Sequence, residues 1–167
     1  VCSGSDAAAR ARRQRFVTAG GIEVAVAAML AHPQVAHVQE YGCWAVACVC
    51  VGTDDAAALA RMQRTADAGG IELIVAALQA HPQVASVQQG GCWALFNVCV
   101  GSDAAARARR QRAVTAGATE AVAGAMQAHP GDAVVQRHGQ GLRRSSCLKG
   151  SGPRGPKERT MNRKKNA

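Results

Sequence analysis

The feature that most constrains this chain is an internal repeat with a period of 48 to 49 residues. Residues 81–101, HPQVASVQQGGCWALFNVCVG, have a counterpart 49 residues earlier in residues 32–52, HPQVAHVQEYGCWAVACVCVG. A third and weaker copy opens 48 residues later at His129-Pro130. A fixed period of this size is typical of a solenoid, in which each unit buries its apolar faces by stacking on its neighbours. We therefore expect an all-α chain of stacked units.

Local signals divide each unit into three helices. Ser5-Asp6 and Ser102-Asp103 precede an Ala- and Arg-rich first helix, and their side-chain oxygens can accept hydrogen bonds from its first N–H groups. Glycine can end that helix in the left-handed conformation. An apolar second helix ends before a His-Pro pair, because a residue before proline is displaced from the helical region, and the proline itself can begin the third helix. The glycines are Gly20, Gly69 and Gly117, and the histidines, interpreted as junction residues and not as bases, are His32, His81 and His129.

The third helix carries a stripe of small apolar residues that we expect to be buried. In the second copy the stripe is Val84, Val87, Gly91, Ala94, Leu95 and Val98, at helical steps of three and four. Trp93 and Asn97 share another face of the same helix. Aromatic residues form only 3% of the chain, so the core must be built largely from small aliphatic side chains.

The length of 167 residues suits one folded domain followed by a tail. Residues 1–4 match the end of a third helix, so we interpret them as the remnant of a preceding repeat and the chain as a fragment of a longer array. Residues 5–52 and 53–101 are predicted to be complete repeats, and residues 102–138 a partial one. From Gly139 the repeat pattern is lost, and Gly, Pro, Ser, Lys and Arg without periodicity predict a disordered basic tail over 139–167.

The net charge of +9 is concentrated in that tail. Residues 1–136 contain ten Arg and ten Asp plus Glu, which cancel, while residues 137–167 contain ten Lys plus Arg against one Glu, which leaves +9. The repeats themselves are electrostatically neutral. Charge therefore gives no support for nucleic-acid binding by the folded part.

Neither a catalytic nor a metal site is predicted. Four of the seven cysteines, Cys43, Cys92, Cys50 and Cys99, pair off as repeat equivalents, and no C-x-x-C pair or paired histidines at ligand spacing occur, so we interpret them as packing residues. No Ser-His-Asp set, paired carboxylates or phosphate-binding glycine loop is present, and we expect no cofactor. Unbridged thiols favour a cytoplasmic or nuclear location. Every apolar run is shorter than the ~18 residues of a membrane span.

The three-helix unit with VQQGGCWALFNVC in its third helix resembles the armadillo repeat. The resemblance covers residues 5–136 and implies a right-handed superhelix whose third helices line a concave groove. In peptide-binding members of that family, Asn side chains of a W-x-x-x-N ladder bond the backbone of an extended peptide and the Trp rings pack against its side chains. The general style is also similar to armadillo arrays of large multidomain proteins such as leucine-rich-repeat kinases, from which no kinase activity carries over.

The resemblance implies a partner-binding groove on the third helices. Trp93 and Asn97 match the ladder, Trp44 matches with Cys48 at the Asn position, and Glu40 has Gln89 as its counterpart. The alternative is that Trp93 fills the gap between units and Asn97 bonds a loop carbonyl. The resulting expectation is a monomeric, non-catalytic scaffold that binds an extended segment of a partner protein.

A column of arginines in the first helices supplies the competing function. The arginines recur in register, and with the basic tail they could bind the phosphates of a nucleic acid. The alternative, which the neutral charge of the repeats favours, is a solvated face whose arginines pair with Asp and Glu. The column comprises Arg12, Arg15, Arg61, Arg64, Arg109 and Arg112.

Overall fold

The described part of the chain consists of helices joined by short turns and contains no strand. The structure, a computed structural model, describes residues 6–52 and 56–144. Within these ranges the helices are α1 (Ala7–Thr18), α2 (Gly21–Ala31), α3 (Ala36–Val49), α4 (Ala56–Asp67), α5 (Gly70–Ala80), α6 (Ala85–Cys99), α7 (Ala104–Thr115), α8 (Ala118–Ala128) and α9 (Ala133–Arg144). The predicted all-α class is confirmed.

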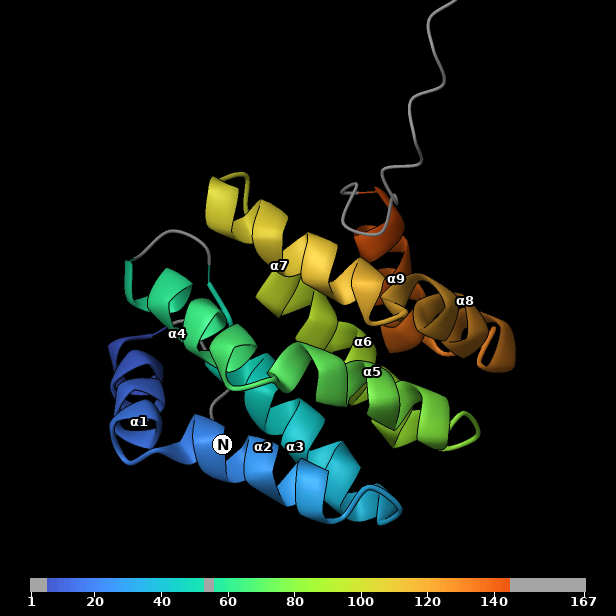
Figure 1. The fold of residues 1–167 in the computed structure, drawn as a ribbon, viewed down its shortest axis with the longest axis horizontal. Helices are drawn as coiled ribbons and strands as arrows, with labels where there is room; N and C mark the ends of the chain where they lie inside the picture. The colour runs from blue at the N-terminus through green and yellow to red at the C-terminus, as the bar shows by residue number, and fades with distance from the viewer. Residues whose placement is uncertain (1–5, 53–55, 145–167) are drawn as a thin grey trace, which may run out of the picture.

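The helices form three units that follow one another across the molecule (Figure 1). Unit one is α1–α3, unit two is α4–α6 and unit three is α7–α9. Equivalent helices of successive units pack together: α6 lies between α3 and α9, and α5 contacts both α2 and α8. The third helices consequently occupy the middle of the core.

The predicted helix boundaries are confirmed at the first helices. Asp6 and Asp103 each accept a hydrogen bond from a backbone N–H of the first turn, at 2.6 Å in both cases. Three glycines between the first and second helices have positive φ angles of 76°, 86° and 91°, which a residue with a Cβ rarely adopts. They are Gly20, Gly69 and Gly117.

The expectation that proline begins the third helix is wrong. Pro33 lies in a turn, and α3 starts three residues later at Ala36 after the extended Val35. A buried glutamine explains the tight turn. Gln39 donates to the carbonyls of Met29 and His32, both at 2.9 Å, and so satisfies acceptors at the end of α2. Gln88 and Gln136 make the same pair of contacts in the other units.

The predicted core stripe of the third helix is confirmed. Val87, Ala94, Leu95 and Val98 are completely buried, Gly91 is buried, and Val84 packs against the core. The four cysteines assigned to packing are also completely buried. Small residues at these positions let the helices of one unit approach those of the next.

The predicted end of the third repeat at residue 138 is wrong, because α9 continues to Arg144. Gly139 is buried against Met126, and Leu142 is completely buried at the position of Ala94. The sequence prediction missed Gly139 and Leu142 because the Cys-Trp-Ala motif is absent from this helix. Burial of these two residues holds α9 against the core. The rest of the predicted tail, residues 145–167, and the predicted remnant, residues 1–4, lie outside the described residues.

Within residues 6–52 and 56–144 no single helix is long and apolar enough to cross a membrane. The pair α1 and α2, bent by 62° at its break, meets the criteria by length and composition only.

Candidate functional site

A row of aromatic rings runs across the third helices of all three units. Trp44 of α3 meets Trp93 of α6 edge-on, with ring centroids 5.1 Å apart and planes at 74°. Trp93 in turn stacks on His138 of α9 at 6.1 Å, and Phe96 lies 5.5 Å from the same imidazole. The four residues, which we call the aromatic row, are each partly exposed. Aromatic pairs at these separations attract one another and leave ring surface available to a ligand.

The row ends in an open hollow on α3. This hollow has a volume of about 430 Å³, and its lining is largely apolar. Three of the predicted groove residues, Glu40, Trp44 and Cys48, lie at its wall. The other lining residues are Phe16, Tyr41, Ala45 and Val49.

Asn97 does not face a partner, and the prediction that it does is wrong. Its side chain is 8% exposed, and its amide donates to the carbonyl of Ala47 at 2.8 Å. Ala47 lies in the last turn of α3, where helical carbonyls have no intrahelical partner. Asn97 therefore joins unit two to unit one, as the alternative interpretation required, although the acceptor belongs to a helix and not to a loop.

Gln89 also connects two units. Its amide donates to a carboxylate oxygen of Asp132 at 2.6 Å, so it is engaged within the described chain. Hydrogen bonds from the backbone N–H of Val135 and from Gln89 hold the pKa of Asp132 below its ordinary value. Partial burial, with a smaller effect of Arg137, lowers the pKa of His138 and so favours its neutral ring.

Four arginines of the column have one of two structural roles within the fold. Arg61 and Arg109 are 6% and 2% exposed, and the Nε of each donates to a carbonyl at the end of the preceding third helix, Val49 at 2.8 Å and Val98 at 2.7 Å. A cation is favourable there because the helix dipole places partial negative charge at the C-terminus.

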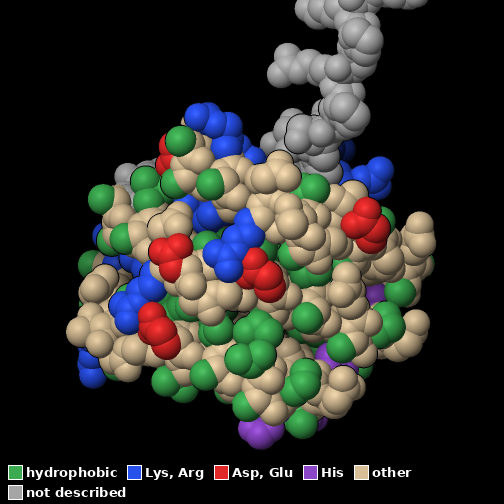
Figure 2. All heavy atoms as spheres, in the orientation of Figure 1, with side chains coloured by type: hydrophobic (Ala, Val, Ile, Leu, Met, Phe, Trp, Pro, Cys, Tyr) green, Lys and Arg blue, Asp and Glu red, His purple; other side chains and the backbone are tan. Residues whose placement is uncertain are grey.

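Two further arginines form ion pairs between units. Arg64 contacts Glu23 with its Nε and its Nη2, and Nη2 lies 3.0 Å from Oε2. Arg112 contacts Glu72 in the same way. The hydrogen bond from Arg64 lowers the pKa of Glu23. Figure 2 accordingly shows acidic and basic side chains next to one another on the visible face.

The six arginines therefore do not form one continuous basic surface, in line with the interpretation that the neutral charge of the repeats favoured. Four of the six are engaged within the fold, whereas Arg12 and Arg15, both on α1, are exposed and have no such contact within the described residues. The interpretation in which arginines pair with Glu is confirmed for Arg64 and Arg112. For Arg61 and Arg109, neither phosphate binding nor ion pairing was the role found, because both are buried and cap a helix.

The cysteines have the properties of core residues. Burial raises the pKa of Cys43 and of Cys92 to about 12, and that of Cys50 to about 11, so these thiols stay protonated at neutral pH. No cluster of three or more His, Cys, Asp or Glu side chains suited to a metal ion occurs within residues 6–52 and 56–144.

Comparison with protein-family models, with curated proteins and with solved structures finds no match for the chain. The arrangement of the site must therefore be interpreted from its own geometry. That geometry offers ring surface, one apolar hollow and a single carboxylate, Glu40, at its edge.

The sequence reasoning missed several members of the site. Tyr41 and His138 occupy the same position of their repeats, nine residues after the junction histidine, where unit two has Gly90. An aromatic residue at that position in two copies was a detectable signal. Phe16 and Phe96 gave no such signal, because neither has an aromatic counterpart in another unit.

Proposed function

We propose that the chain is an armadillo-type α-solenoid. The proposal is supported by the 48- to 49-residue period and by the packing of the second and third helices on their equivalents in the next unit. It is also supported by hydrogen bonds that recur in register between units. His81 and His129 each bond the proline carbonyl of the preceding junction at 2.8 Å, and these carbonyls belong to Pro33 and Pro82.

The function that this geometry supports best is non-catalytic protein binding by the third helices. The aromatic row is the observation that carries it, since partly exposed tryptophans are the residues most often responsible for affinity at protein interfaces. An extended segment of a partner would lie across α3, α6 and α9 and pack its side chains against the rings. Glu40 could accept a hydrogen bond or a cationic group at the α3 end.

The mode of binding differs from the ladder that the resemblance implied. The Asn97 side chain is 8% exposed and its amide already donates to Ala47, so little of it is accessible to a partner's backbone. Affinity would come from ring surface and from exclusion of water. The interaction is therefore expected to depend weakly on salt.

Nucleic-acid association is a less supported alternative. The arginine column that motivated it is mostly engaged in helix caps and ion pairs. Its remaining basis is the basic segment 145–167, which lies outside the described residues. Binding to phosphates would fall steeply as the salt concentration rises, because counterions are released on binding.

The test is selection of unconstrained 12-residue peptides against the chain, followed by measurement of Kd for the best peptide. Trp44→Ala and Trp93→Ala should each weaken binding by about 2 kcal/mol, roughly thirtyfold, because each removes a ring from the contact surface. Gln79→Ala, at an exposed position of α5, is the matched control and should leave Kd unchanged.

Urea unfolding of each variant separates lost contact from lost fold. Weaker binding by variants that remain folded at the assay temperature supports the proposal. Peptides that bind Trp44→Ala and Trp93→Ala as tightly as the parent chain would contradict it. A single-stranded oligonucleotide that binds tightly at low salt, while no peptide is enriched, would favour the alternative function.

A further inference from the structure

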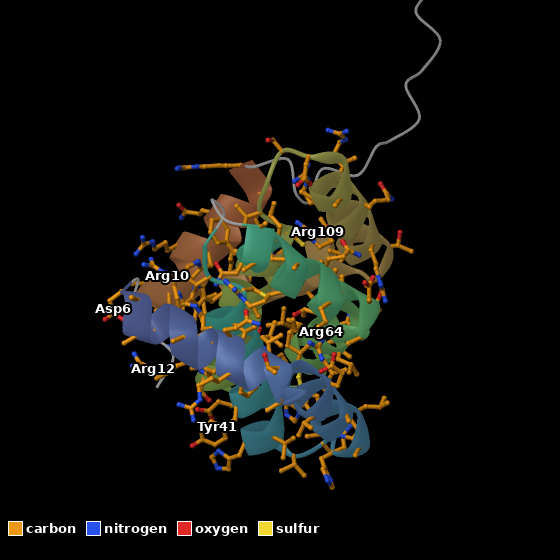
Figure 3. All side chains as sticks on the ribbon, turned by 90° about the vertical axis from the view of Figure 1, so that its left-hand side faces the viewer. Asp6, Arg10, Arg12, Tyr41, Arg64 and Arg109 are labelled. Carbon is orange, nitrogen blue, oxygen red and sulfur yellow. The ribbon has the colours of Figure 1, made fainter. Side chains whose placement is uncertain are left out.

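The face of unit one that points away from unit two carries an unpartnered apolar surface. A second hollow of about 370 Å³ opens on it, and its wall includes Ala25, Ala28, Val38 and Ala45. Val24 and Tyr41 on its rim are both 67% exposed. We call this surface the α1–α3 outer face. Tyr41 lies at this edge of the molecule in Figure 3, as does the exposed Arg12.

The same positions are buried in the other two units. The counterparts of the four wall residues in unit two are Ile74, Ala77, Val87 and Ala94, and those in unit three are Val122, Ala125, Val135 and Leu142. All eight are no more than 3% exposed. They are covered in part by the preceding unit, since α6 packs on α3 and α9 on α6. The hollow in unit one therefore corresponds to the surface that, in units two and three, is covered by the preceding unit.

Polar groups on the outer face repeat this pattern. Arg15 occupies the position of Arg64 and Arg112, each of which pairs with a glutamate of the preceding unit. Arg12 occupies the position of Arg61 and Arg109, which cap the preceding third helix. Within the described ranges Arg12 and Arg15 are exposed and no acceptor is found for either.

His32 completes the set of open donors. It stands at the position of His81 and His129, whose ring nitrogens bond a proline carbonyl of the preceding unit. The His32 side chain is exposed. Arg12, Arg15 and His32 therefore lie at the positions through which units two and three bond the unit before them. The apolar hollow lies at the position of their buried apolar contacts.

We propose that the α1–α3 outer face is a docking surface for a further three-helix unit of the same kind, joined in tandem ahead of α1. The unit must present a glutamate to Arg15, as Glu23 does to Arg64, and a carbonyl at the end of its third helix to Arg12. It must also present a ring at the position of Trp44, because Trp93, at that position in unit two, stacks on His138, the counterpart of Tyr41.

A second copy of this chain in head-to-tail order fits the surface less well. The corresponding surface of its α9 would bring Gln140, Arg143 and Arg144, all exposed, against the apolar hollow. At the position of Trp44, α9 of the second copy has Gly141, which has no side chain to occupy the place of the ring. Burial of unpaired guanidinium groups in an apolar site is unfavourable.

The experiment duplicates unit one in front of itself. A copy of residues 5–52 is placed directly before Ser5 of the full chain, and the copy carries Tyr41→Phe so that the original Tyr41, the chain's single tyrosine, can be followed alone. Nitration of Tyr41 should slow at least tenfold in the extended chain, with mean helicity per residue maintained. Arg15→Ala in the original unit one should lower the urea midpoint of the extended chain, because it removes the ion pair with the copy's Glu23. The same substitution should leave the urea midpoint of the parent chain unchanged.

The matched control is the same extended chain with Glu23→Lys and Trp44→Ala in the copy, for which Tyr41 should be nitrated faster than in the unaltered extension. Nitration of Tyr41 at the parent rate in a helical extended chain would overturn the proposal. A copy that adds no helix would also overturn it, because docking on this face is what should fold the copy. Sedimentation equilibrium of the parent chain tests the alternative occupant. Self-association that protects Tyr41 from nitration would show that a second copy occupies the α1–α3 outer face, and would overturn the proposal of a tandem unit.

Discussion

At the residue scale, several buried polar side chains of this chain bond the ends of helices. Arg109 donates to Val98, Asn97 to Ala47 and Gln88 to Leu78 and His81, and every acceptor lies at or beside the end of a helix. The last carbonyls of a helix have no partner within it, so each bond removes a cost of burial. The polar residues thereby fix where one unit meets the next.

Arg109 should matter more to stability than Arg112. Arg109→Met removes the hydrogen bond to Val98 and should cost about 2 to 3 kcal/mol, since it leaves a buried helical carbonyl without its charged donor. Arg112→Met removes an ion pair whose side chains are about 40% exposed and should cost less than about 1 kcal/mol. The measurement is the urea dependence of helicity at 222 nm. Equal losses in the two variants would show that the buried cap has no special importance.

At the element scale, close contact of second and third helices depends on one glycine position. Gly42, Gly91 and Gly139 occupy the same place in the three third helices. A Cβ at each would approach a side chain of the second helix within 2.4 to 2.6 Å, at Met29, Leu78 and Met126 respectively. Contacts of that length do not occur between unstrained atoms, so the glycine sets the separation of the helices.

A pair of glycine substitutions tests this packing. Gly91→Ala should destabilise the chain by about 1 to 3 kcal/mol, because Leu78 has to leave its place in a filled core. Gly124→Ala, in the interior of α8 with no atom within 4 Å of the new Cβ, should stabilise it by about 0.5 to 1 kcal/mol through helix propensity. Thermal unfolding of both variants measures the difference. A stabilising Gly91→Ala would mean that the helices can separate without loss.

At the scale of the whole molecule, one continuous core links the three units. The main cluster contains Cys43 of α3, Cys92 of α6 and Leu142 of α9, while a smaller cluster of Val17, Ile22, Val26 and Val49 lies within unit one. A unit in such a stack is stable through its interfaces, and opening of one interface exposes the next. Access to the buried cysteines therefore reports the integrity of the stack.

Thiol labelling gives that report. Cys43 and Cys92 should react with a thiol reagent at pH 8 only as fast as the stack opens, because both are completely buried and their pKa values of about 12 keep them protonated. Cys48, which is partly exposed, should react faster. Peptide mass mapping over a time course distinguishes the sites. Fast labelling of Cys92 in a fully helical chain would contradict a continuous core.

The sequence alone determined the repeat, the three helices of each unit, their caps and the apolar stripe. These properties are local, since a period, a glycine at a positive φ or an Asp at a helix start acts over a few neighbouring residues. It also determined that the cysteines pack in the core, because they share the stripe's spacing.

Only the tertiary structure decided what the polar residues do and where the third unit ends. The partners of Asn97 and of Arg64 lie 50 and 41 residues earlier in the chain, so their contacts depend on the stacking of whole units. α9 lost the motif that marks a third helix but kept Gly139 and Leu142, and burial against Met126 and the core holds it in place. Such contacts are properties of a surface assembled from two units, and a pattern within either unit does not contain them.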